Sequence, residues 1–216
     1  MKLYGYFRSS ATYRTRIALN IKGIAWDAAF VDLRASSSAQ HTPQFRALNP
    51  HGLIPVLQDG PHTLTQSLAI IEYLEETHPE PPLLPRTPLE RAQVRALALA
   101  VACDIHPLNN TRVLAYLRSP LGADEAAVNA WYAHWIALGF SALEKDAQRR
   151  SGDGRHLYGT TVTLADVCLV PQMANAHRFK VDVEPYPTLR TICAHLEGLP
   201  AFARAAPAVQ PDAQLP

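Results

Sequence analysis

Short apolar runs alternate with helical spacing over the first 83 residues of the chain. Apolar runs between turn residues predict strands, and apolar positions three and four residues apart predict helices. The predicted strands are residues 3–7, 26–33, 56–58 and 63–65, and the predicted helices are residues 12–22, 43–48 and 67–78. This order, β-α-β-α-β-β-α, is typical of a small mixed sheet covered by helices.

Residues that favour helix ends support these assignments. Gly23 follows the first predicted helix at the position that glycine prefers. Thr42-Pro43 combines a capping residue with proline at the first helical position. Ser67 is predicted to cap the third helix, because it directly precedes the apolar spacing of that segment.

A proline-rich stretch, PEPPLLPRTP, separates this part of the chain from a purely helical part. Its five prolines in the ten residues 79–88 predict a stiff, extended linker. The predicted helices beyond it are residues 88–118, 124–149, 163–178 and 188–196, and Pro107 and Pro171 should bend or break theirs. The sequence therefore predicts an α/β domain at 1–83, a linker at 84–87 and an all-α domain at 88–216.

Composition and charge exclude several classes of function. The 216 residues are 48% hydrophobic and carry a formal net charge of +1, so nucleic acid and anionic membrane are poor partners. The start MKLYGYFRSS has no long apolar region, and no run of about 18 apolar residues occurs, so neither a secretory signal nor a membrane span is expected.

The cysteines and histidines favour a cytoplasmic protein without a metal. Cys103, Cys168 and Cys193 form no CxxC pair and are expected to be buried in helices. The nine histidines show no spacing typical of metal ligands. An odd number of unpaired thiols is typical of a reducing compartment.

The stretch RSSATYRTR, residues 8–16, joins a predicted strand to a predicted helix. Hydroxyl groups at such a turn lie beside unpaired backbone N–H groups and the positive end of the helix dipole. This environment stabilises an anion and lowers the pKa of a thiol. The alternative is that Ser9, Ser10 or Thr12 only caps the helix.

Two further stretches carry possible binding groups. In NPHGLIPVL, residues 49–57, a cis bond before Pro55 would expose the main chain of Ile54 to an extended peptide; the alternative is an ordinary edge proline. Gln66-Ser67 opens another helix, where a carboxylate would meet N–H donors and a hydroxyl. The alternative for this pair is again a simple cap.

A thiolate site, an extended-backbone site and a carboxylate site together describe glutathione. Their order and spacing resemble the glutathione transferases, which have a thioredoxin-like domain, a linker and an all-α domain. The resemblance covers essentially the whole chain. Thr163-Leu164-Ala165-Asp166 resembles the capping box of that family's second domain, in which Asp166 reaches back to Thr163.

Within that family, SSATYRTRIAL resembles the signature of the zeta class. Ala11 stands where the class usually has cysteine, and Tyr13 stands where it has tryptophan. CDIHPLNNTRVLAYL and AHRFKVDVEPYP, at residues 103–117 and 176–187, resemble the bacterial isomerases of the class. These enzymes convert maleylacetoacetate or maleylpyruvate from cis to trans with glutathione as cofactor.

The resemblance implies a role for each matching residue. Ser9 would bind the glutathione thiolate, beside Ser10 and the main chain of Ala11. Ile54 would pair with the cysteinyl unit, and Gln66 and Ser67 would bind the γ-glutamyl carboxylate. From the helical domain the implied cofactor-site residues are Asp104, His106, Asn110 and Arg112. The residues implied to act on the diacid substrate are Arg8, Arg112 and Arg178, together with Ser9 as the catalytic hydroxyl.

Several alternatives remain at the level of the sequence. A general glutathione transferase and a non-catalytic glutathione-binding protein share the same scaffold. A reductive dehalogenase is disfavoured, because the resembling enzymes use the cysteine that Ala11 replaces. His106 is equally well explained as a buried, hydrogen-bonded residue before a proline kink. Arg14 and Arg16 are expected to form ion pairs on the first helix. A homodimer is implied by the resemblance.

Overall fold

The computed structural model describes residues 1–34 and 38–214. Its contacts divide the chain into two compact units, which are described separately. The N-terminal unit comprises Met1–Pro82 together with Leu199–Pro216, and the helical unit comprises Leu83–Gly198. Within the described residues, no helix is long and apolar enough to cross a membrane.

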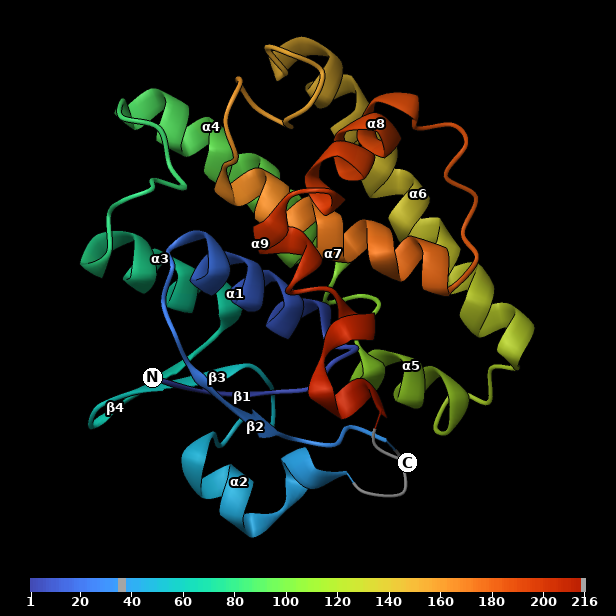
Figure 1. Ribbon diagram of the computed structural model, residues 1–216. Coiled ribbons are helices and arrows are strands. Elements are labelled where there is room, and N and C mark those ends of the chain that lie inside the picture. Colours follow the sequence, from blue (N-terminus) through green and yellow to red (C-terminus); the bar gives the residue numbers. More distant parts are fainter. Residues whose placement is uncertain (35–37, 215–216) are drawn as a thin grey trace. The chain divides into compact units, whose positions relative to one another are not determined.

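The N-terminal unit is built on a four-stranded mixed sheet, and it has the thioredoxin-like fold expected from the sequence (Figure 1). Its strands are β1 (Lys2–Gly5), β2 (Asp27–Phe30), β3 (Val56–Asp59) and β4 (His62–Thr65), in the spatial order β2-β1-β3-β4. β1 pairs in parallel with β2 and antiparallel with β3, and β3 and β4 form a hairpin. The predicted order of strands and helices is confirmed.

Helices cover the sheet of the N-terminal unit on both faces. In Figure 1, α1 (Ser10–Ile21) and α3 (Ser67–Thr77) lie on one face and α2 (Pro43–Leu48) lies on the other. A 3₁₀ turn, Ala39–His41, precedes α2. Fully buried Ile17 and Ile70 belong to α1 and α3, and Phe45 of α2 packs in a second cluster with Val31 and Val56. Burial of these apolar faces fixes the helices on the sheet.

The ends of α1 follow the predicted chemistry. Ser9 is the N-cap, and Gly23, with φ of +65°, follows the C-cap. The N–H of Gly23 donates to the Asn20 carbonyl and that of Ile24 donates to the Leu19 carbonyl, which is the Schellman arrangement. At α3 the prediction is wrong, because Gln66 is the N-cap and Ser67 is the first helical residue.

The helical unit contains α4 (Pro88–Leu99), α5 (Thr111–Arg118), α6 (Glu125–Arg150), α7 (Leu164–Arg178) and α8 (Pro187–Glu197). The predicted helix at 88–118 is interrupted, because α4 continues into a π-helix, Ala100–Ile105. At the end of this π-helix, the N–H of His106 donates to the carbonyl of Val101, five residues earlier, at 2.9 Å. Pro107 directly follows, and a proline clashes with the carbonyl four residues before it, which explains why the helix widens and ends here. Pro171 lies within α7 and does not interrupt it.

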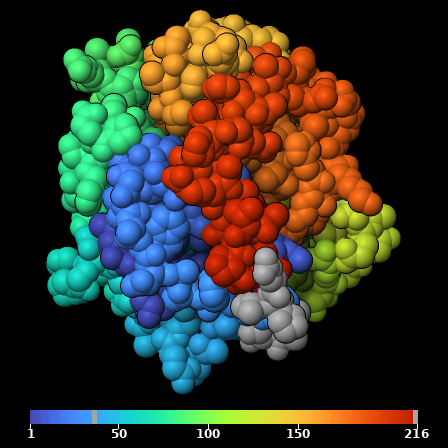
Figure 2. All heavy atoms as spheres, in the orientation of Figure 1, coloured from blue at the N-terminus to red at the C-terminus, as the bar shows by residue number. Residues whose placement is uncertain are grey.

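Residues 199–214 turn back onto the N-terminal unit. They form α9 (Pro200–Ala203) and the 3₁₀ turns Pro207–Val209 and Pro211–Gln214. The side-chain amide of Asn20 donates to the Ala201 carbonyl at 2.8 Å, and Arg16 Nε donates to the Ala205 carbonyl at 3.0 Å. Figure 2 shows this segment in red against the blue of α1. The sequence assigned these residues to the all-α domain, whereas their contacts are with the first unit.

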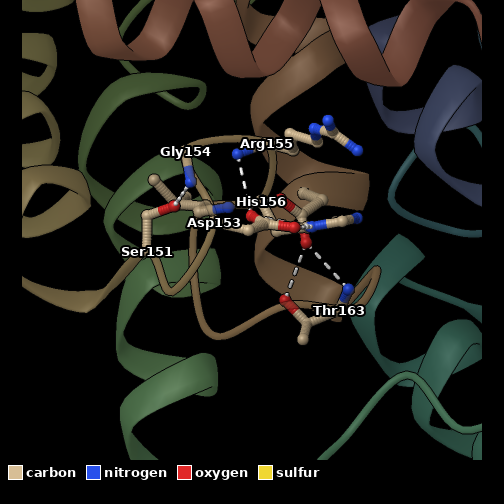
Figure 3. A network of polar contacts seen from close by, with 8 residues as sticks. Ser151, Asp153, Gly154, Arg155, His156 and Thr163 are labelled. Atoms are coloured by element: carbon tan, nitrogen blue, oxygen red, sulfur yellow. Dashed lines mark hydrogen bonds and ion pairs between the residues drawn. The ribbon is translucent and has the colours of Figure 1, made fainter.

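Asp166, at the start of α7, organises the loop that follows α6. Its Oδ2 accepts hydrogen bonds from the Thr163 N–H at 2.8 Å and the Thr163 hydroxyl at 3.0 Å, and its Oδ1 accepts from the Leu157 N–H at 2.7 Å. Asp166 thus reaches back to Thr163 as the TLAD pattern predicts. Figure 3 shows the neighbouring loop, where Asp153 accepts from the Arg155 N–H and contacts the His156 ring. The loop is therefore held by carboxylates at both ends.

Acidification should stabilise the protein through Asp166. Burial outweighs the three hydrogen bonds and raises the pKa of this carboxyl from 3.8 to about 6. A carboxyl whose pKa is higher in the folded state contributes stability that is full below the unfolded pKa and is lost as the pH rises through the folded value. From about pH 7 to about pH 4.5, this group should add roughly 2 kcal/mol to the free energy of unfolding.

The measurement compares urea unfolding of the wild type and Asp166→Asn at the two pH values. The asparagine does not titrate, so the difference in unfolding free energy between the two proteins should move in favour of the wild type at the lower pH. A difference that stays constant, or moves against the wild type, would show that the hydrogen bonds dominate and that the pKa is not raised.

Candidate glutathione and diacid site

A tight turn, Tyr6–Ser9, connects β1 to α1. The N–H of Ser9 donates to the Tyr6 carbonyl at 3.0 Å and closes the turn. Ser9 Oγ accepts from the Thr12 N–H at 3.2 Å, and the Ser9 carbonyl accepts from the Tyr13 N–H at 2.8 Å. Ser9 is therefore fixed by three hydrogen bonds, and its position is dictated by the end of β1 and the start of α1.

The cap bond leaves Ser9 able to act on a ligand. A hydroxyl group has one proton to donate and two lone pairs that accept. The bond from the Thr12 N–H uses a lone pair, so the hydroxyl proton remains available to an anion. The first turn of α1 contains no acidic residue that would compete for its positive end. Capping and anion binding are therefore compatible at Ser9, while Ser10 and Ala11 are buried in the first turn.

Ile54 presents its main chain beside the start of β3. The Ile54–Pro55 peptide bond is cis, which is one of the two alternatives that the sequence left open. Neither the N–H nor the carbonyl of Ile54 has a hydrogen bond to another part of the described chain. The preceding loop is held by buried Asn49, whose amide donates to the Leu53 carbonyl at 2.7 Å. Ile54 thus offers one donor and one acceptor to an extended peptide.

Gln66 and Ser67 open α3 in an unusual backbone conformation. Gln66 has φ of +67°, the left-handed region that non-glycine residues rarely adopt, and its side chain is exposed and makes no capping hydrogen bond. Ser67 is buried, and the first turn of α3 again contains no acidic residue. Unused N–H groups, a hydroxyl and the helix dipole therefore converge at a place suited to a carboxylate.

Strand register gathers these three places at one end of the sheet. Tyr4 of β1 faces Val56 of β3, and Val56 faces Thr65 of β4. The end of β1, the start of β3 and the end of β4 are therefore neighbours. Adjacent strands lie about 4.8 Å apart, so β1 and β4 are separated by about 10 Å, which matches the reach of three extended residues. A tripeptide lying across the start of β3 fits these donors and acceptors.

In the helical unit, four predicted residues lie on the π-helix, on the first turn of α5 and in the loop between them. Asp104 is exposed on the π-helix, and His106 follows it half-buried. Asn110 is the N-cap of α5, and its Oδ1 accepts from the Arg112 N–H at 3.1 Å. The Arg112 side chain is exposed. The π-helix was not predicted, although Pro107 marked the place where the helix ends.

The sequence also missed Tyr132, which connects this region to Arg178. The Asn109 amide donates to the Tyr132 carbonyl at 3.1 Å, and the Tyr132 ring stacks on Phe179 with centroids 3.7 Å apart. The Arg178 guanidinium lies 4.9 Å from the centroid of that Phe179 ring. Burial raises the pKa of Tyr132, and the charge of Arg178 acts in the opposite direction. Tyr132 thus links the loop before α5 to the end of α7, where Arg178 is exposed.

Two expectations about single residues are wrong. Arg14 and Arg16 are both buried, with 1% and 4% of their surface exposed, and the ion pair expected for Arg16 is replaced by contacts with the backbone. Arg16 donates to two backbone carbonyls, those of Phe7 and Ala205. Cys168 and Cys193 are buried as expected, but Cys103 is exposed on the π-helix.

Neither a small cavity nor a metal cluster offers another site in the described residues. A cavity of about 20 Å³ lies in the N-terminal unit between the sheet and residues 210–212, with Thr12 and Arg16 in its wall. Small-molecule sites have volumes of about 300 Å³ or more, so this cavity is a packing gap. Across residues 1–34 and 38–214, no three His, Cys, Asp or Glu side chains are grouped to hold a metal ion.

Comparison with known proteins agrees with this geometry. Residues 3–82 match the family described as "Glutathione S-transferase, N-terminal domain". A Vibrio cholerae protein named "Probable maleylacetoacetate isomerase" is 54% identical over 211 residues, which cover 98% of this chain and 97% of that protein.

Two solved structures are also similar over nearly their whole length. One is a holo structure of maleyl pyruvate isomerase, described as a bacterial glutathione S-transferase of the zeta class, with a TM-score of 0.95, 50% identity and coverage of 98% of this chain and 99% of that chain. The other is a maleylacetoacetate isomerase from Methylobacterium extorquens with bound malonate and glutathione, with a TM-score of 0.93, 42% identity and coverage of 98% of both chains. The chain belongs to the glutathione S-transferase family, and within it to the zeta class.

Replacement of Ser9 should show how much its capping hydrogen bond contributes to the free energy of unfolding. Ser9→Ala removes the acceptor of the Thr12 N–H and should lower the free energy of unfolding by about 1 kcal/mol, whereas Ser9→Gly should cost only a few tenths. Urea unfolding of both variants checks this. Equal stability of Ser9→Ala and the wild type would show that the cap contributes nothing, and a loss well above about 2 kcal/mol would indicate a larger structural role.

Proposed function

We propose that this protein is a glutathione-dependent cis–trans isomerase of a small maleyl diacid, maleylpyruvate or maleylacetoacetate, in the breakdown of aromatic compounds. The observation that carries the proposal is Ser9, which caps α1 through a lone pair and keeps its hydroxyl proton for an anion. The relatives with these names, and the malonate and glutathione in one of the similar structures, support the choice of cofactor and of a dicarboxylate substrate.

The described residues fit glutathione. The main chain of Ile54 has a donor and an acceptor without a partner among the described residues, and Gln66 and Ser67 open a helix suited to the γ-glutamyl carboxylate. When bound, glutathione supplies a sulfur nucleophile that adds reversibly to the double bond and allows it to rotate. The N-terminal unit contains no cysteine, so the protein itself supplies no thiol there.

Ser9 has the task of keeping that sulfur ionised. A thiol of this kind has a pKa of about 8.5, and lowering it by roughly two units requires about 2.7 kcal/mol of stabilisation of the anion. One hydroxyl donor and the open end of α1 supply energies of this size. Ser10 and the main chain of Ala11, in the first turn of α1, are proposed to lie beside the same sulfur. Asp104, His106 and Asn110 are proposed to contribute to the cofactor site from the helical unit.

Arg8, Arg112 and Arg178 are proposed to bind the substrate. A diacid with two nearby carboxylates calls for guanidinium groups, whose planar fork pairs with a carboxylate. Arg8 directly precedes Ser9, and all three side chains are exposed. Their charges would also stabilise negative charge that develops on the substrate's oxygens during the reaction.

A spectrophotometric assay of both substrates, with and without glutathione, tests the function directly. We expect isomerisation of at least one substrate only when glutathione is present. In Ser9→Ala, turnover should fall strongly while glutathione still binds, and the pKa of the bound thiol should rise towards its solution value. A protein that isomerises neither substrate would contradict the proposal, and it would favour a general transferase or a non-catalytic binding protein.

The arginines can be tested by their specificity for diacids. Arg112→Met and Arg178→Met keep much of the side-chain stem and remove the charge. Since a charge-assisted contact contributes about 1.5 to 3 kcal/mol, each change should lower kcat/KM for the diacid by roughly 10- to 150-fold. Arg118→Met is the matched control, because Arg118 is also an exposed residue of α5 but pairs with Glu125. A variant that retains the activity of the control would show that its arginine is structural.

We also propose a cytoplasmic homodimer. The three cysteines are free, as expected in a reducing compartment. Leu89 of α4 is 69% exposed and is the apolar side chain that we propose to contact the second copy. Light scattering should give twice the 23.8 kDa of one chain. Leu89→Lys should weaken the dimer, whereas Leu138→Lys on α6, which replaces a leucine that is 58% exposed, should not. A monomer at assay concentration would contradict this assignment.

A further inference from the structure

The C-terminal segment reaches the turn that positions Ser9. The Asp212 carboxylate accepts a hydrogen bond from the Phe7 N–H at 2.8 Å, although the two residues are 205 positions apart in the sequence. Asp212 is only 7% exposed. A buried carboxylate is costly unless it is hydrogen-bonded, and its bonds to N–H groups are stronger than neutral ones. The hydrogen bond between Asp212 and Phe7 therefore holds the turn Tyr6–Ser9 firmly against the C-terminal segment.

Arg16 holds the other side of the same residue. Its Nη2 donates to the Phe7 carbonyl at 3.1 Å, and its Nε donates to the Ala205 carbonyl at 3.0 Å. Burial lowers the pKa of Arg16 to about 10, and the negative charge of Asp212 opposes that shift. The two peptide groups that flank Phe7 are thus held by opposite charges, one from α1 and one from the C-terminal segment.

Phe7 transmits this constraint to both residues that follow it. Phe7 and Arg8 are the central residues of the turn closed by the Ser9 N–H and the Tyr6 carbonyl. The Arg8 guanidinium lies 4.8 Å from the centroid of the Phe7 ring, within the range of a cation–π contact. Movement of Phe7 would therefore shift the Arg8 charge and the Ser9 hydroxyl together.

We propose that Asp212 is a positioning residue of the active site, which sets the placement of Arg8 and Ser9 by holding the Phe7 N–H. This inference rests on the proposed function of Ser9. It assigns a role in catalysis to the C-terminal segment, which touches the turn and not the reacting atoms. A contact that only stabilised the fold would affect unfolding but not the properties of the bound thiol.

The test compares Asp212→Ala, Asp212→Asn and Asn20→Ala. Asn20→Ala is the matched control, since Asn20 also links α1 to the C-terminal segment, through the Ala201 carbonyl, but does not touch the turn. For Asp212→Ala we expect kcat to fall about ten- to a hundredfold, since small misplacements of catalytic groups cost this much. The pKa of the bound glutathione thiol should rise by about one unit, with little change in KM for glutathione.

Asp212→Asn keeps an acceptor oxygen but loses the charge. Since a neutral hydrogen bond is about half as strong, its kcat and thiol pKa should lie between those of the wild type and Asp212→Ala. If Asp212→Ala does not fold, the comparison of Asp212→Asn with the wild type decides alone. Asn20→Ala should lower the stability of the protein while it keeps the wild-type kcat and thiol pKa.

Two outcomes would overturn the inference. Asp212 variants that lose stability but keep the wild-type kcat and thiol pKa would show a purely structural contact. An equal loss of activity in Asn20→Ala would show that any loosening of the segment has the same effect. The proposed function fails separately, because it requires wild-type protein to isomerise a maleyl diacid with glutathione, and that assay is performed first.

Discussion

The hydrogen-bonded turn between β1 and α1 is the constraint on which the candidate site depends. Ser9 Oγ accepts from the Thr12 N–H at the start of the helix, and the Ser9 N–H donates back to the Tyr6 carbonyl at the end of the strand. Both bonds satisfy backbone groups, whatever ligand the protein binds. These bonds use the backbone N–H of Ser9 and one lone pair of its hydroxyl oxygen. The hydroxyl proton is therefore left to donate a hydrogen bond to a ligand. Helix capping and the proposed binding of the thiolate therefore use different parts of one residue.

The pairing of the strands in the mixed sheet brings two further candidate binding groups beside Ser9. Parallel pairing with β2 and antiparallel pairing with β3 bring the start of β3 beside the end of β1, and the β3–β4 hairpin adds the start of α3. Two helix N-termini without acidic side chains thus lie on either side of Ile54, whose main chain has no hydrogen bond within the described residues. A ligand with a thiolate, an extended backbone and a carboxylate matches this arrangement group by group.

The sequence predicted the features that depend on local chemistry. Ser9, Gly23, Thr42 and Asp166 were identified because capping and turn residues act within a few positions of themselves. The zeta-class signature was also recognised, and the cis bond at Pro55 was one of two alternatives that the sequence left open. What was missed depends on contacts between distant residues or on unusual backbone. The positive φ of Gln66, the π-helix before Pro107 and the Tyr132–Phe179 stack are of this kind.

Arg16 shows most clearly why such features escape a reading of the sequence. On a helix with nearby charges it appeared to be an ion-pairing surface residue. Its burial depends on residues 199–214 folding back onto α1, and nothing near Arg16 in the sequence encodes that return. The same return brings Asp212 to Phe7, so the C-terminal segment gains a connection to the turn only in three dimensions.

A crystal structure of the protein with bound glutathione and malonate would show most directly whether Ser9 binds the thiolate. We expect the sulfur to lie within about 3.5 Å of Ser9 Oγ, a hydrogen-bonding distance. We also expect the main chain of Ile54 to pair with the cysteinyl unit, and the malonate carboxylates to contact the guanidinium groups of Arg8, Arg112 or Arg178. A sulfur held by another group, with Ser9 bonded only to the helix, would contradict these expectations and leave Ser9 as a cap.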